Sequence, residues 1–187
     1  MEENKILFVD LDGTLIKEDL SDLAFSHSLR NYPFKTLFYL FIFLFKGKPY
    51  LKENISKNFT VPFANLTFNN AAIDFVKELK NKHIVVYLIS GSHQALVDQI
   101  DKFLNLFYES FGTRGSFNMV GSNKVKFIIE NLKIYDFDYL GNSHQDLPIW
   151  KYTKRALHTN ASIELKKTIK SLDFENREVP ANFKLTD

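Results

Sequence analysis

The sequence predicts an α/β protein built on a doubly wound parallel sheet with helices on both faces, a three-layer arrangement. Short, continuous apolar runs at 5–10 and 83–90 end in polar residues, and the segment 137–142 ends in the same way, as central strands of a covered parallel sheet do. Segments with helical spacing lie between or after these runs, at 69–81, 93–106, 123–132 and, beyond a weaker strand at 155–159, at 161–172. Strands that alternate with helices favour this fold class, in which ligands bind beyond the carboxyl ends of the strands.

The alternation of strands and helices fails in two parts of the chain, and these parts indicate the domain organisation. Residues 17–67 have the pattern of several helices separated by prolines and a glycine. We therefore expect a helical cap inserted into a core domain formed by 1–16 and 68–172. From 173 to 187 the chain is polar and lacks periodicity, which predicts a tail or linker.

Composition and charge narrow the classes of function. The net charge is +2 and both signs are interspersed, so the dense basic stripe typical of nucleic-acid binding is missing and no nucleic-acid partner is expected. The absence of cysteine excludes disulfides, thiolate metal sites and a thiol nucleophile. The acidic start, MEENKILFVD, leads straight into a predicted strand, so neither a signal peptide nor a transit peptide is expected. These features predict a cytoplasmic protein.

A phenylalanine-rich segment at 34–48 is the anomaly of the composition. Its uninterrupted apolar part, 37–45, is much shorter than the roughly 20 residues that cross a bilayer, so we expect a buried or interfacial helix. Two interpretations remain open. The segment is the apolar core of the cap, or its apolar face, flanked by Lys46, Lys48 and Lys52, lies on a membrane surface or admits a lipid tail.

Two carboxylates follow the first predicted strand, in the stretch FVDLDGTL. Asp10 and Asp12 are two residues apart in extended chain, which directs both to the same side. Gly13 permits a sharp turn, and Thr14 can bind the loop backbone or an anion. Alone, Asp-Gly after a strand is more often only a turn.

Further polar residues follow the other predicted strands. In LISGS, the hydroxyl of Ser90 and the backbone N–H of Gly91 lead into a helix, which suits an anion. Lys124 begins the helix before the last central strand and could neutralise a phosphate. Arg114 either contacts an anionic substrate from the rim or is a surface charge.

In this order, DLDGTL, LISGS, a lysine and GNSHQDLP resemble the four motifs of the haloacid dehalogenase (HAD) superfamily, over about residues 5–165. The resemblance implies a HAD-like, Rossmann-like core, and most superfamily members are magnesium-dependent phosphatases. More narrowly, KGKPYLKENIS, FDYLGNSHQDLPIW and HTNAS are similar to the soluble HAD domain that precedes the membrane part of UbiA-type prenyltransferase fusions.

The resemblance implies a role for each motif residue. Asp10 would be the nucleophile, and Asp12 the general acid and base, with its backbone carbonyl on Mg²⁺. Ser90 would bind the transferring phosphoryl oxygens, supported by Thr14 and Gly91. Lys124, or Lys126 if the register differs, would offset charge together with the metal.

One position departs from the superfamily pattern. Asn142 stands where most members have an aspartate that binds Mg²⁺, and a neutral amide should bind a hard cation less tightly. Asp146 matches the second acid of this motif and could bind the metal directly or through water. The expected magnesium ligands are therefore Asp10, Asp12, Asn142 and Asp146.

These features predict a Mg²⁺-dependent phosphatase that hydrolyses the phosphate monoester of a small molecule, either a lipid-linked or a sugar phosphate. A protonated Asp12 suits an alkoxide leaving group and has little use in dehalogenation, whereas phosphoryl transfer to another alcohol stays open. The alternative is a catalytically weak or silent HAD-like module. It would bind a phosphorylated, prenyl-linked intermediate or accompany a membrane prenyltransferase, which places it at the membrane surface. The oligomeric state is open.

Overall fold

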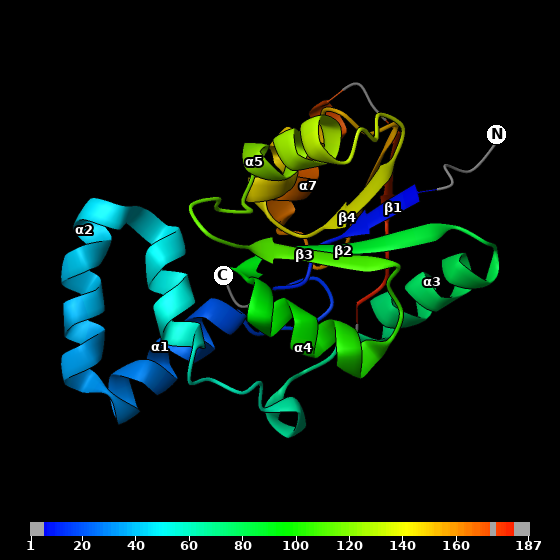
Figure 1. Cartoon of the computed structure of the whole chain (residues 1–187). Coiled ribbons are helices and arrows are strands. Elements are labelled where there is room, and N and C mark those ends of the chain that lie inside the picture. The colour runs from blue at the N-terminus through cyan, green and yellow to red at the C-terminus, as the bar shows by residue number, and fades with distance from the viewer. Residues whose placement is uncertain (1–5, 173–174, 182–187) are drawn as a thin grey trace.

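Within the described residues, the strands form one parallel sheet of six, in the order β3-β2-β1-β4-β5-β6. A computed structural model describes residues 6–172 and 175–181 (Figure 1). The strands are β1 (Ile6–Val9), β2 (Val85–His93), β3 (Glu109–Thr113), β4 (Asp138–Gly141), β5 (Arg155–His158) and β6 (Glu175–Glu178). Every neighbouring pair is parallel, which confirms the predicted fold class.

Helices cover both faces of the sheet. The helices α3 and α4 lie on one face, and α5 and α7 lie on the other (Figure 1). Their bounds, with those of the short helical turns, are η1 (Phe63–Asn65), α3 (Asn70–Asn81), α4 (Gln94–Leu104), α5 (Ser122–Lys126), η2 (Phe127–Asn131), η3 (His144–Asp146), α6 (Leu147–Trp150) and α7 (Ile163–Ser171).

The side chains of β1 show why this strand is apolar throughout. Leu7 and Val9 belong to the core shared with α3 and α4, whereas Phe8 belongs to the core shared with α5 and α7. Successive side chains of a strand point to opposite faces, so every position of a strand covered on both faces is directed into a core. The continuous apolar run in the sequence is the direct consequence.

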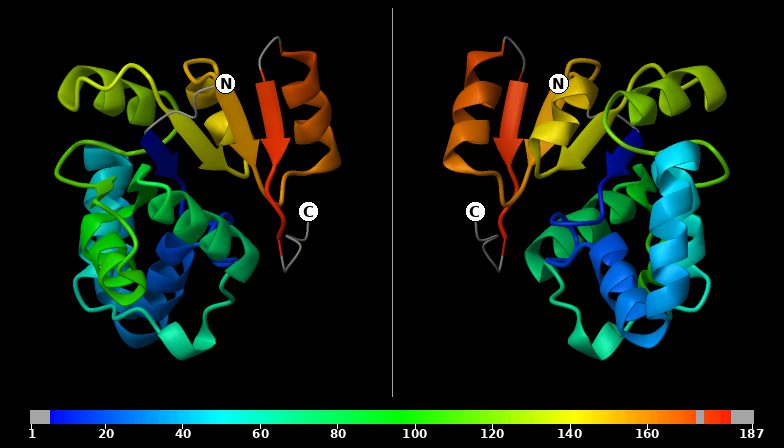
Figure 2. Two further views of the ribbon diagram at one scale, coloured as in Figure 1. Left: turned by 90° about the vertical axis from the view of Figure 1, so that its right-hand side faces the viewer. Right: turned by 90° about the vertical axis from the view of Figure 1, so that its left-hand side faces the viewer.

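Of the helices between β1 and β2, two α-helices lie within residues 17–67, ahead of η1 and α3. They are α1 (Leu20–Asn31) and α2 (Pro33–Ser56), and α2 is broken at Gly47, where φ is 75°. The break divides α2 into two arms, of which the first lies at the outer edge of the molecule (Figure 1). In both views of Figure 2, α2 and α7 lie on opposite sides. None of the helices in the described part of the chain combines the length and hydrophobicity needed to cross a membrane.

Two strands escaped the sequence analysis. The segment 173–187 was expected to be a tail or linker, but Glu175–Glu178 pairs with β5 as the edge strand β6. All four of its residues are exposed, so it carries no apolar pattern. The remainder of that segment, 173–174 and 182–187, lies outside the described residues. The other missed strand, β3, forms the opposite edge and is likewise partly exposed.

Candidate active site

The carboxylate of Asp10 lies at the end of the central strand β1. Its backbone N–H donates to the carbonyl of Leu140 at 2.9 Å, which continues the pairing of β1 with β4. Its side chain is nearly buried, and Oδ1 accepts a hydrogen bond of 2.7 Å from the Nζ of Lys124. The other oxygen of Asp10 has no hydrogen-bond donor among the described residues. That oxygen is the one available to an electrophile or a cation.

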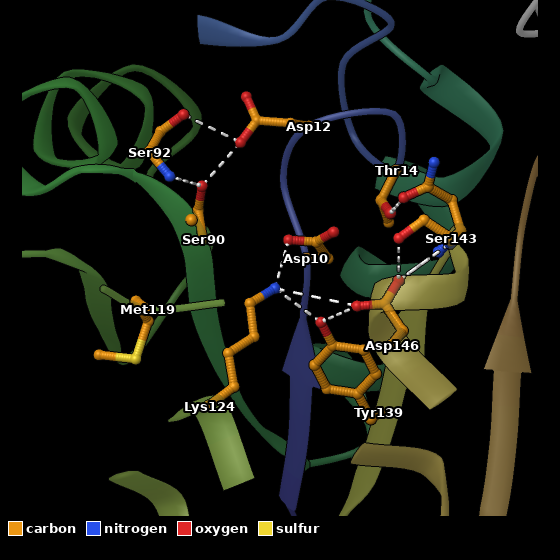
Figure 3. A network of polar contacts seen from close by, with 12 residues as sticks. Asp10, Asp12, Thr14, Ser90, Ser92, Met119, Lys124, Tyr139, Ser143 and Asp146 are labelled. Carbon is orange, nitrogen blue, oxygen red and sulfur yellow. Dashed lines mark hydrogen bonds and ion pairs between the residues drawn. The ribbon is translucent and has the colours of Figure 1, made fainter. Parts of the chain in front are cut away.

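Lys124 connects three groups of the site. It is only 4% exposed, and its Nζ donates to Asp10 and, at 2.8 Å, to the hydroxyl of Tyr139. The Nζ also lies 4.0 Å from Asp146 Oδ1. Figure 3 shows the amine between these three side chains. Lys126, the alternative considered from the sequence, is exposed and lines a separate hollow on the other side of α5.

Asp12 accepts hydrogen bonds from a separate set of donors, which does not include Lys124. Its Oδ2 accepts from the hydroxyls of Ser90 at 2.8 Å and Ser92 at 3.0 Å (Figure 3). Its Oδ1 accepts from the backbone N–H of Leu20, the first residue of α1. Ser92 was not selected from the sequence. Its spacing of two from Ser90 in a strand was the available signal, because such residues share a face.

Burial raises the pKa of both carboxyl groups. The pKa of Asp10 rises from its ordinary 3.8 to about 7 through burial, opposed by Lys124 and reinforced by the charges of Asp146 and Asp12. The pKa of Asp12 rises to about 6, again through burial and then through the charge of Asp19, while its three donors oppose the rise. A carboxyl group with such a pKa can give or take a proton near neutral pH.

Asp146 organises the loop after β4. Its Oδ2 accepts from the backbone N–H groups of Asn142 and Ser143, each at 3.0 Å, and its Oδ1 accepts from the Tyr139 hydroxyl at 2.7 Å. The hydroxyl of Ser143 also donates to it, at 3.3 Å. Both oxygens of Asp146 therefore accept hydrogen bonds. This carboxylate holds the loop after β4 in place, together with the Tyr139 hydroxyl that contacts Lys124.

The side chain of Asn142 packs on the turn after Asp12. The Thr14 hydroxyl donates to Asn142 Oδ1 at 3.1 Å. A Cβ on Gly13, whose φ is 77°, would lie only 2.2 Å from Asn142 Nδ2, so only glycine allows this contact. Thr14 is fully buried and orients the Asn142 amide in this structure.

A cavity of about 500 Å³ opens above these groups. Its polar wall includes Asp10, Asp12, Gly91, Ser92, Lys124, Asn142 and Asp146, and its outer wall includes Asp19, Phe25, Phe43, Lys48, Leu51, Lys52 and Ile55 from the α1–α2 region. Ser90 and Thr14 are fully buried and are not among the lining residues. The cavity thus joins carboxylates from the sheet to lysines and apolar side chains from α1 and α2.

Two residues depart from what the sequence suggested. Arg114, considered as a substrate contact, does not line this cavity and instead lines a second hollow of about 720 Å³ with Asp98 and Asp101. It follows β3, the edge strand, and so lies away from the central strand ends.

Lys52, considered only as a flanking charge, enters the site and donates to the Gly91 carbonyl at 2.6 Å and to Asn118 Oδ1 at 3.0 Å. Burial lowers the pKa of Lys52, opposed by the charges of Asp19 and Asp12.

The oxygen donors fit a hard cation only in part. Among residues 6–172 and 175–181, no three His, Cys, Asp or Glu side chains converge as a metal site. However, Asp10 has an oxygen without a donor and the Asn142 amide oxygen accepts one hydrogen bond, and both suit Mg²⁺. The engaged oxygens of Asp146 do not suit direct ligation.

The chain is similar in sequence to a longer protein of unassigned role. No protein-family model matches the chain. The chain is 31% identical over 180 residues to an uncharacterized protein, y4nM, from Sinorhizobium fredii (strain NBRC 101917 / NGR234). The alignment covers 91% of this chain and 33% of that protein. The chain therefore spans about a third of the length of this curated relative.

Solved structures show the fold. Substrate-bound phosphoserine phosphatase superposes with a TM-score of 0.59 at 17% identity and covers 99% of this chain and 96% of its own. A phospho-aspartyl intermediate analogue of phosphoserine phosphatase gives 0.57 at 15% identity, over 98% and 96%. A HAD-superfamily hydrolase from Ehrlichia chaffeensis gives 0.55 at 17% identity, over 91% and 96%. The structural neighbours are HAD-superfamily hydrolases, and the α/β fold is HAD-like.

Proposed function

We propose that the protein is a Mg²⁺-dependent phosphatase that hydrolyses a phosphate monoester through an aspartyl phosphate on Asp10. The observation that supports this most directly is the pairing of two differently supported carboxyl groups in one cavity. Asp10 lies 2.7 Å from the Lys124 amine, and Asp12 is held by two serine hydroxyls. The lysine favours the carboxylate form of Asp10, and Asp12 lies in the same cavity with a pKa that burial raises to about 6, so it can give and take a proton near neutral pH.

In the first step, the free oxygen of Asp10 attacks phosphorus while the bond from phosphorus to the ester oxygen breaks. Asp12 gives its proton to the departing alkoxide, so an alcohol leaves and an aspartyl phosphate remains. The pKa of about 6 keeps part of Asp12 protonated near neutral pH. Lys124 offsets the negative charge that otherwise keeps a carboxylate from a phosphate.

In the second step, Asp12, now a carboxylate, takes a proton from water. The water oxygen attacks phosphorus, the bond to Asp10 breaks, and inorganic phosphate leaves. We expect the Ser90 hydroxyl, which donates to Asp12 here, to donate to a phosphoryl oxygen when substrate is bound. Asp10, Asn142 and the Asp12 carbonyl would hold Mg²⁺, which supplies charge neutralisation for the phosphoryl oxygens.

The cavity wall bears on the class of substrate. Phe25, Phe43 and Leu51 give the outer part an apolar surface, and Lys48 and Lys52 add positive charge beside it. This mixture favours a phosphorylated small molecule with an apolar portion, such as a lipid-linked phosphate, over a sugar phosphate. We place this specificity in the helical cap of residues 17–67, because that segment supplies all five side chains.

Asp10→Asn tests the proposed reaction. We expect release of p-nitrophenol from p-nitrophenyl phosphate with Mg²⁺ to fall by at least about a thousand-fold, because an amide is a poor nucleophile. Asp136→Asn is the matched control, since Asp136 is exposed and pairs with Lys154 outside the cavity, and it should retain activity. Equal activity of Asp10→Asn and the parent would refute the nucleophile.

A silent phosphate-binding module is the second candidate, favoured by the engaged oxygens of Asp146 and by the neutral amide of Asn142, which both weaken the site for Mg²⁺. In this role the cavity would hold a phosphorylated, prenyl-linked intermediate, or the chain would accompany a membrane prenyltransferase. A substrate panel of sugar and prenyl phosphates with Mg²⁺ separates the candidates. Calorimetric binding of a prenyl phosphate without turnover by the parent protein would favour the module.

A further inference from the structure

The first arm of α2 presents an apolar stripe to solvent. Its side chains are between 57% and 86% exposed, and they recur at helical spacings of three and four residues. We call them the outer stripe: Phe34, Leu37, Phe38, Phe41, Leu44 and Phe45. The arm forms the left-hand edge of Figure 1, away from the sheet.

The internal packing of the protein does not account for the outer stripe. The inner side of the same arm makes the contacts with the rest of the fold: Thr36 is buried and bonds Ser28 of α1 at 2.7 Å, and Phe43 lines the cavity. The other exposed large apolar side chains of the described residues are scattered over separate elements. A contiguous apolar surface of this kind is typical of an interaction site.

The charges around the stripe are of one sign. Residues 23–52 contain no Asp or Glu but have five Lys and Arg, although the whole chain has 22 acidic residues. Lys35 and Lys46 stand at the two ends of the outer stripe, and both are exposed. An apolar face bordered by cations is complementary to an anionic lipid surface. A second copy of the chain would instead bring like charges together.

We propose that the outer stripe of α2 docks on an anionic membrane surface, with the first arm lying in the plane of the interface. This arm is about 20 Å long, shorter than the roughly 30 Å hydrocarbon core of a bilayer. Lys35 and Lys46 would contact acidic headgroups while the phenylalanines enter the acyl boundary. Because Phe43 and Lys48 of α2 line the cavity, docking would place the cavity near the lipid. Docking does not depend on the proposed phosphatase activity.

Vesicle co-sedimentation of the whole chain tests the proposal. We expect binding to vesicles of phosphatidylcholine mixed with phosphatidylglycerol, and weaker binding to phosphatidylcholine alone. The double variant Phe41→Glu, Phe45→Glu should lower the partition coefficient by at least about ten-fold. The control Tyr135→Glu, Tyr152→Glu changes two exposed aromatic residues elsewhere and should bind as the parent does.

A second pair of variants separates the role of charge from that of apolar area. Lys35→Gln, Lys46→Gln should weaken binding to the anionic vesicles by about five-fold per charge and leave binding to phosphatidylcholine unchanged. Asp10→Asn should bind like the parent, so a loss of catalysis is distinguishable from a loss of docking.

Two results would overturn the proposal. One is failure of the parent to sediment with the anionic vesicles. The other is a parent dimer, seen by light scattering, that the Phe41→Glu, Phe45→Glu variant dissociates without any vesicle binding, because the outer stripe would then join two copies of the chain.

Discussion

Asp10 and Asp12 are the same residue type, two positions apart, yet their surroundings differ. Asp10 faces a buried lysine, whereas Asp12 accepts hydrogen bonds from two hydroxyls and the start of α1. Burial raises the pKa of both, to about 7 and about 6. The order of the two pKa values does not by itself make Asp10 the nucleophile, because its pKa is the higher of the two. The contact of Asp10 with the Lys124 amine, which favours the charged carboxylate, is the observation that supports this role.

Replacing Asp19 should move the pH dependence of the proposed reaction. The charge of Asp19 helps to raise the pKa of Asp12, so in Asp19→Asn the acid form of Asp12 should be lost at lower pH. The alkaline limb of kcat/KM for an alkyl phosphate should then shift to lower pH. Asp19 also caps α1, and asparagine caps helices equally well, so stability should hold.

The choice of substrate provides the control for this prediction. p-Nitrophenolate leaves without a proton, so its pH profile should respond less to Asp19→Asn than the profile of the alkyl phosphate. An unchanged alkaline limb for the alkyl phosphate would contradict the role of Asp19.

Asn142→Asp should tighten magnesium binding, because a carboxylate binds a hard cation better than an amide does. The Thr14 hydroxyl that donates to Asn142 Oδ1 can donate equally to a carboxylate. We expect the Mg²⁺ concentration for half-maximal activity to fall by about ten-fold. Asn131→Asp, outside the cavity, is the control, and an unchanged magnesium curve for Asn142→Asp would argue against Asn142 as a ligand.

At the scale of elements, α2 links the insertion to the sheet. Its second arm carries Lys52, which donates to the carbonyl of Gly91 at the end of β2. Its first arm carries the outer stripe, and the break at Gly47 sets the relation between the two arms. The backbone there, with φ 75° and ψ −177°, is in a region that only glycine adopts readily.

Gly47→Ala should lower the free energy of unfolding by about 1–3 kcal/mol. The nearest atom to a Cβ at this position, Pro49 Cδ, is 3.9 Å away, so the cost comes from the backbone and not from a clash. The KM of the proposed reaction should rise, because Phe43 and Lys52 belong to different arms. Gly115→Ala, at an open turn with φ 59°, should lower stability without changing KM. Denaturant titration measures the free energy of unfolding of the two variants, and steady-state kinetics measures their KM.

The central strands and most flanking helices could be predicted, because burial on both faces imposes continuous apolar runs on β1 and on the first half of β2. The edge strands β3 and β6 could not be predicted from the sequence. All residues of β6 are exposed, so its pairing depends on backbone hydrogen bonds that any side chains permit. For the candidate site, the structure places Asp10 in contact with Lys124 and Asp12 in the same cavity, and their strand-end positions are visible in the sequence. The place of Lys52 in the cavity depends on the path of α2, which the sequence does not indicate.

At the scale of the whole molecule, the sheet separates two apolar cores and leaves the acidic site at its carboxyl edge. Buried carboxyl groups with raised pKa values lower stability once they ionise. Such a site is therefore retained at the expense of stability, as is common where function requires buried charge.

The stability of the metal-free protein should depend on pH through Asp12. Because its folded pKa, about 6, exceeds the ordinary 3.8, the folded state binds this proton more tightly than the unfolded state does. The carboxyl group therefore destabilises the fold increasingly as pH rises from about 4 to about 7. The free energy of unfolding of Asp12→Asn minus that of the parent should grow over this range by up to roughly 3 kcal/mol.

Denaturant titrations in EDTA at a series of pH values measure this difference. Burial lowers the pKa of His158 and His93, which lowers stability as pH falls, but both histidines are present in parent and variant and cancel in the difference. A difference that stays constant with pH would contradict the raised pKa of Asp12.

The sequence alone determined the parallel α/β sheet and the motif residues at its strand ends, because hydrophobic periodicity and extended-chain spacing are local properties. Only the tertiary structure decided which polar groups meet. It placed Lys124 between Asp10 and Asp146, engaged Asp146 with the loop it fixes, removed Arg114 from the cavity and brought in Lys52. These pairings join positions far apart in the chain, so they depend on how the layers pack and not on any local pattern.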